Sequence, residues 1–161
     1  MRNPRTTAAI AGHPIHPMLI PFPIAFFIAA FVSDIAFLSS ANAGWATASL
    51  WLLGVGLIMA ALAAVTGVIE VAGEPRIREL RAVWYHAGGN VLAVVIELYN
   101  WFSRYSTTGT TVTSTQFVLS LIAVALLAFT GWMGGELVFR HRVGVADEDA
   151  ADETVARTGR P

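Results

Sequence analysis

Four histidines are the residues of this chain whose chemistry is most suggestive. His13 and His16 lie three residues apart, and each is followed by a proline, so the backbone here is expected to depart from an ordinary helix start. His86 and His141 come much later in the chain. An imidazole can bind a metal ion, or accept and donate a proton near neutral pH. Histidine at a membrane boundary is costly to bury without a partner, so all four are candidate site residues. The sequence contains no cysteine, which excludes thiolate ligands and disulfides.

The composition indicates that these histidines sit in a membrane protein. Of 161 residues, 55% are hydrophobic and only 13% are charged, and a soluble domain carries about twice that charged fraction. Four apolar segments are each near the ~20 residues needed to cross a bilayer, and only helices satisfy their own backbone there. The segments are Pro17–Leu38, Ser49–Val71, Val83–Phe102 and Phe117–Phe139.

These segments predict an all-α, polytopic membrane protein built as an up-and-down bundle of four transmembrane helices. The bundle is expected to occupy residues 1–145 as a single domain, followed by a disordered, acidic, cytoplasmic tail over residues 146–161. The first segment is longer than the apolar core of a signal peptide and contains Asp34 and several prolines. We therefore expect it to be retained.

The arginines predict the orientation of the bundle. Four crossings place both termini and the loop between the second and third helices on one side, together with all the arginines except Arg104. Because positive residues are enriched on the cytoplasmic side, both termini are expected there. The net charge of -1 gives no support to a nucleic-acid partner. The expected partner is the lipid bilayer.

The same topology brings the histidines to one level of the bundle. The first and third helices lie diagonally, so His16 and His86 could face each other and bind the iron of haem b, with His13 and His141 as substitutes. Arg81 and Arg140 could pair with the haem propionates. Asn90 lies one turn from His86 and could orient that ring or satisfy a nearby carbonyl.

Other interpretations stay open. A transition metal ion could be held by histidine and glutamate ligands, or the histidines could form a metal-free proton relay. The chain could also be a non-catalytic permeation, assembly or purely structural subunit, and Gly131 and Gly135 could allow close packing of a helix, including one from a second copy. The candidate metal ligands are His13, His16, His86, His141, Glu70 and Glu136.

Two acidic residues belong to the other end of the bundle. Glu97 lies eleven residues beyond His86, or about 16 Å further along a helix axis. Asp34 is similarly far from His16 on the first helix. These carboxylates are expected either to pair with Arg104 or to mark the end of a proton or cation path.

Two motifs resemble a known family. The opening Gly12-His13-Pro14-Ile15-His16-Pro17-Met18-Leu19-Ile20 and the ending Gly134-Gly135-Glu136-Leu137-Val138-Phe139-Arg140-His141 are similar to the signatures of bacterial membrane proteins classed as domain of unknown function 2231. The resemblance implies four membrane helices in a bacterial cytoplasmic membrane, without an established activity. Relatives are joined to Rieske-type or cytochrome domains, which implies electron transfer with a quinone or a partner redox domain.

Overall fold

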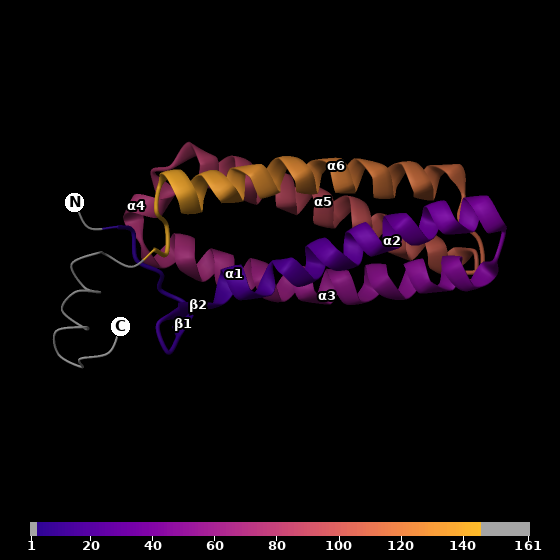
Figure 1. Cartoon of the computed structure of the whole chain (residues 1–161), viewed down its shortest axis with the longest axis horizontal. Coiled ribbons are helices and arrows are strands. Elements are labelled where there is room, and N and C mark those ends of the chain that lie inside the picture. The colour runs from indigo at the N-terminus through magenta and orange to yellow at the C-terminus, as the bar shows by residue number, and fades with distance from the viewer. Residues whose placement is uncertain (1–2, 146–161) are drawn as a thin grey trace.

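The computed structural model describes residues 3–145 and consists mainly of long helices. The predicted tail, residues 146–161, lies outside this range. Figure 1 shows two helical hairpins laid lengthwise against each other. The elements, in chain order, are strands β1 (Ala9–Ile10) and β2 (His13–Pro14) and helices α1 (Ile15–Leu19), α2 (Pro21–Ser40), α3 (Ala43–Gly73), α4 (Pro75–Arg78), α5 (Arg81–Ser106) and α6 (Ser114–Gly135), with the π-helical turn η1 (Glu136–Arg140).

The first predicted helix is divided into α1 and α2. Pro21 is the first residue of α2 and has no N–H to donate to the carbonyl of Pro17, so the helical hydrogen bonding is interrupted at Ile20. Upstream, β1 and β2 form a short antiparallel hairpin whose turn contains Ala11 and Gly12, both with positive φ. The expected departure from an ordinary helix start is therefore confirmed, although the hairpin itself was not predicted.

The helices pack as two hairpins that cross each other. Helix α2 packs on α3 and α6, while α5 packs on α6 and α3, so α2 and α5 are diagonal neighbours. The core lies between the middle sections of the helices, where Phe27 fills the space beside Gly56. In Figure 1 the hairpins are closest near the α2–α3 and α5–α6 connections and diverge toward α1 and α4.

The two ends of the described chain meet at the diverging end of the molecule. The amide of Gly144 donates to the carbonyl of Pro4 (3.0 Å), and the amide of Thr7 donates to the buried Glu70 carboxylate (3.1 Å). Beside them Glu74 caps α4, and its hydrogen bonds from Arg76 lower the pKa of Glu74 to about 2. These contacts hold the N-terminal segment against the end of α3.

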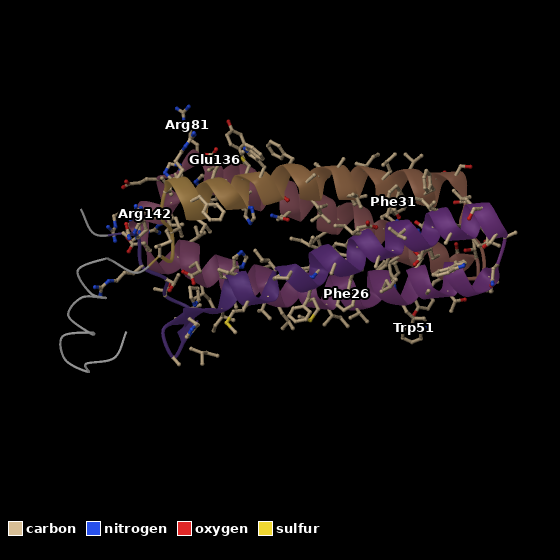
Figure 2. The ribbon with its side chains drawn as sticks, in the orientation of Figure 1. Phe26, Phe31, Trp51, Arg81, Glu136 and Arg142 are labelled. Atoms are coloured by element: carbon tan, nitrogen blue, oxygen red, sulfur yellow. The ribbon has the colours of Figure 1, made fainter. Side chains whose placement is uncertain are left out.

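The outer surface of the helices is apolar, as a lipid-facing surface requires. Large exposed side chains include Trp51 (69%), Val91 (64%) and Trp132 (71%), and Figure 2 shows Trp51 projecting away from the bundle. Within residues 3–145, three helical stretches are long and apolar enough to cross a membrane: Ile15–Ser40, Ala43–Gly73 and Ser114–Arg140. Helix α5, which carries Arg81, Glu97 and Arg104, is not among them.

Candidate functional site

Two of the predicted histidines lie side by side at the diverging end of the bundle. The ring centroids of His16, on α1, and His86, on α5, are 6.3 Å apart, and the ring planes are nearly perpendicular at 82°. Both side chains are half-buried. The structure thus brings together the pair that diagonal packing predicted, from segments seventy residues apart in the sequence.

Each ring is held by a backbone carbonyl of the neighbouring helix. His16 Nδ1 lies 2.8 Å from the carbonyl oxygen of Ala63 on α3, and His86 Nδ1 lies 2.8 Å from that of Thr130 on α6. A carbonyl oxygen can only accept, so both Nδ1 atoms donate and each neutral ring keeps its lone pair on Nε2. Histidines that bind metals are commonly oriented in this way by a hydrogen bond from the other ring nitrogen.

A glycine gives each ring the space it occupies. A Cβ added at Gly67 would lie 3.1 Å from Cε1 of His16, and one added at Gly134 would lie 3.3 Å from Cε1 of His86. Both distances are shorter than an ordinary carbon–carbon contact, about 3.5–4.0 Å. Any larger residue at these two positions would therefore push an imidazole out of its present place.

The two halves of the site repeat each other. His16 precedes Asp34 by eighteen residues and His86 precedes Arg104 by eighteen, while each carbonyl acceptor precedes its glycine by four. The buried positions of α2 also recur seventy residues later on α5: Pro23 and Ala93, Phe27 and Glu97, Ala30 and Asn100, Asp34 and Arg104. The hairpins are therefore equivalent units, and this spacing was the sequence signal that could have identified Ala63, Gly67, Thr130 and Gly134.

Asn90 satisfies carbonyl and hydroxyl groups around His86 rather than the ring itself. Its Nδ2 donates to the backbone carbonyl of His86 (2.8 Å), and its Oδ1 accepts from the hydroxyl of Thr130 (3.2 Å). Thr130 also supplies the carbonyl that receives the His86 ring. Of the two predicted roles, the one found is the satisfaction of a carbonyl.

The other predicted metal ligands do not join this pair. His13 lies in β2, where its side chain is exposed, and His141 follows η1. Glu70 accepts a hydrogen bond from the amide of Thr7 in the N-terminal segment, and Glu136 forms a surface ion pair with Arg140. Over residues 3–145, no three histidine or acidic side chains come together in an arrangement that could hold a metal ion. The structure therefore offers two imidazoles, and no larger ligand cluster among these residues.

The predicted propionate partners lie at the periphery. Figure 2 shows Arg81 extending away from the bundle, with Glu136 and Arg142 near the same end of the molecule. Arg140 pairs with Glu136 at 3.0 Å, and its side chain is 74% exposed. Neither Arg81 nor Arg140 contacts the side chain of His16 or His86.

A second polar cluster lies at the opposite end, inside the bundle. Arg104 and Asp34 are fully buried and form a bidentate ion pair, with both oxygen–nitrogen distances 2.8 Å. The hydroxyls of Ser49 (3.0 Å) and Ser120 (3.3 Å) accept further hydrogen bonds from the guanidinium. The pairing with Asp34 was one of the predicted roles. However, Arg104 is a core residue of α5 rather than a charge facing the outer solution, because the helix extends past Phe102 to Ser106.

Comparison with known proteins supports membrane placement. The model of the family described as predicted membrane protein DUF2231 matches residues 12–147. No curated protein matches the chain, and no solved structure does. The family match begins at the glycine before His13 and spans both hairpins, so it includes both imidazoles of the pair. The chain belongs to the DUF2231 family of predicted membrane proteins.

Proposed function

We propose that this protein binds haem b between His16 and His86 and transfers electrons within a bacterial cytoplasmic membrane. The observation that carries the proposal is the imidazole pair, with centroids 6.3 Å apart and each Nδ1 bound to a carbonyl. Two imidazoles that bind opposite sides of one metal ion at ~2 Å have centroids on the order of 6 Å apart. A tetrahedral ion would bring them to roughly 5 Å.

The number of ligands also favours haem over a bare ion. A structural zinc ion takes four protein ligands, and a catalytic one takes three. Among residues 3–145, no third histidine or acidic side chain accompanies the pair. Haem iron needs only two axial protein ligands, because the porphyrin supplies the other nitrogens. The donor set therefore fits haem b better than the predicted ion site.

The chain's own residues would set the properties of this site. Ala63 and Thr130 hold the ring orientations through their carbonyls, and Gly67 and Gly134 leave room for the rings. Bound haem would supply a one-electron Fe(III)/Fe(II) couple. A quinone in the surrounding lipid or a partner redox domain would exchange electrons with it.

We also infer that α5 crosses the membrane as a fourth span. Its charged residues Glu97 and Arg104 are fully buried inside the bundle, so its hydropathy understates how apolar its outer face is. With four crossings, the arginine-rich end that holds both described chain ends faces the cytoplasm. The imidazole pair would then lie toward the cytoplasmic leaflet.

Visible absorption of the purified full-length protein tests the haem proposal. The wild type is expected to show a Soret band typical of two axial imidazoles, and His16→Ala or His86→Ala should each lose most of it. His13→Ala and His141→Ala are matched controls, because these histidines lie outside the pair, and both should keep the band.

Three results would contradict this proposal. The protein could stay colourless after reconstitution with haem, or the band could survive both single substitutions at His16 and His86. A third contrary result is a stoichiometric metal ion without porphyrin in elemental analysis. That result would favour the metal-binding alternative.

A further inference from the structure

We propose that Glu97 is a proton-binding site in the core of the bundle, open to the aqueous phase at the end that carries the α2–α3 and α5–α6 connections. The side chain is fully buried, with 0% of its surface exposed. Its Oε2 accepts a hydrogen bond from Asn100 Nδ2 (2.9 Å). Its Oε1 is buried and has no hydrogen-bond partner within the described part of the chain.

The charges around Glu97 do not balance unless it takes up a proton. Asp34 faces this region from α2, and Arg104 lies two turns along α5 from Glu97, where the two form a bidentate pair that is neutral as a unit. Helices α3 and α6 contribute the uncharged hydroxyls of Ser49 and Ser120, and within residues 3–145 neither helix places a buried charged side chain beside the pair. Arg104 is the one buried cation in residues 3–145. An ionised Glu97 would therefore add an uncompensated buried charge, which is far more costly than a neutral acid.

A metal cation does not fit the same place. Sodium or calcium would need several oxygen ligands with free lone pairs. The hydroxyl of Ser120 donates to Asp34 and accepts from Arg104, and that of Ser49 donates to the carbonyl of Ala30. The hydroxyl oxygens are thus committed to the ion pair, and a proton is the cation that one unpartnered carboxylate oxygen can bind.

Polar groups continue from Glu97 in one direction only. The hydroxyl of Ser103 donates to the carbonyl of Asn100 (2.7 Å), and it accepts from Gln116 Nε2 (3.2 Å). Gln116 in turn accepts from the amide of Thr113, whose residue is exposed. Toward the imidazole pair, the next inward position of α5 is the apolar Ala93. This asymmetry favours proton exchange with the outer end of the bundle.

Infrared spectroscopy of the full-length protein in lipid nanodiscs tests this inference. At pH 7, where an ordinary glutamate is ionised, the wild type should show a buried protonated-carboxyl C=O band that shifts in D2O. Glu97→Gln should abolish the band. Glu70→Gln is the matched control: it also removes a buried glutamate with one unpartnered oxygen, but that side chain is 7% exposed and accepts backbone amide hydrogen bonds from Thr7 and Ala8, so the band should persist.

A second variant keeps the test valid if the first one misfolds. If Glu97→Gln does not fold, Glu97→Met should, because the matching position of the other hairpin is the apolar Phe27. The inference is overturned if the wild type lacks the band, or if the band survives loss of Glu97 or disappears with Glu70. The measurement does not require haem, so its outcome is independent of the redox proposal.

Discussion

The ability of His16 and His86 to bind a ligand depends on the groups that fix the orientation of their rings. A histidine on a helix can rotate freely, whereas these rings are each fixed by one carbonyl and given space by one glycine. Because both Nδ1 atoms donate, each neutral ring keeps a lone pair on Nε2 that can bind an electron-pair acceptor. The environment of the rings, rather than their sequence motif, separates them from His13 and His141.

Substitution of the two glycines should weaken the site without removing a ligand. Gly67→Ala or Gly134→Ala forces its imidazole to shift by a few tenths of an ångström, because the added methyl would be 3.1 or 3.3 Å from the ring. Changes behind a metal ligand typically cost about 10–100-fold in affinity. Titration of haem into the purified variants should show a loss of this size.

The control for this experiment lies on α6, the helix that also carries Gly134. A Cβ added at Gly131 meets nothing within 4 Å, so Gly131→Ala should bind haem as the wild type does. Equal losses in all three variants would show that the effect comes from helix packing in general and not from crowding of the rings.

At the level of the helices, the buried ion pair explains how α2 and α5 stay together although they are diagonal. Helices α2 and α5 each pack on both α3 and α6, while Asp34 and Arg104 link α2 to α5 directly. The link lies toward the α2–α3 and α5–α6 connections, where the hairpins are closest, and Figure 1 shows them diverging at the other end. The imidazoles lie at this wider end of the bundle.

Breaking this pair should destabilise the fold strongly. Asp34→Asn or Arg104→Met leaves one buried partner uncompensated, at a cost of about 3–5 kcal/mol. Thermal unfolding in detergent should show a large decrease in melting temperature. The double variant Asp34→Leu/Arg104→Leu should recover much of that decrease, because no unpaired charge remains.

An exposed pair provides the comparison. Arg140→Ala breaks the ion pair with Glu136. The side chain of Arg140 is 74% exposed, and exposed ion pairs contribute about 0–1 kcal/mol to stability. A melting temperature as low as that of Arg104→Met would argue against burial as the reason for the cost.

Considered as a whole, the molecule is a pair of equivalent hairpins with different chemistry at its two ends. One end holds the imidazole pair, the contacts between the chain ends and, among residues 3–145, every arginine except Arg104. The other end holds Asp34, Arg104 and Glu97 inside the core. Between them α5 presents Asn90, Ala93 and Glu97 toward the interior, with Ala93 as the apolar break.

Single cysteines should reveal whether α5 crosses the membrane, since the chain has none of its own. Four crossings place Ser39 and Thr110 on one side and Glu79 on the other, and all three residues are exposed. A membrane-impermeant maleimide should label Ser39→Cys and Thr110→Cys in intact spheroplasts. Glu79→Cys should react only after permeabilisation. Labelling of Thr110→Cys together with Glu79→Cys would mean that α5 does not cross.

The sequence by itself determined the helices and the membrane environment. Long apolar segments with few charges leave helices as the only way to satisfy the backbone in lipid. Two of the predicted segments lie within α3 and α5, while the first spans α1 and α2 and the fourth spans α6 and η1. The prolines after His13 and His16 also predicted the departure from an ordinary helix start. These properties depend on composition and local geometry alone.

Only the tertiary structure decided which polar residues meet. Sequence position favoured His16 and His86 as a pair and kept His13 and His141 as substitutes, and the hairpin packing brings His16 beside His86 while His13 and His141 lie outside the pair. Pairing of Arg104 with a carboxylate was one of two expected roles, and the packing decided that its partner is Asp34, seventy residues away, and that the pair is fully buried. Such contacts depend on helix rotation and crossing, which are set by the combined packing of all four long helices and not by any one of them.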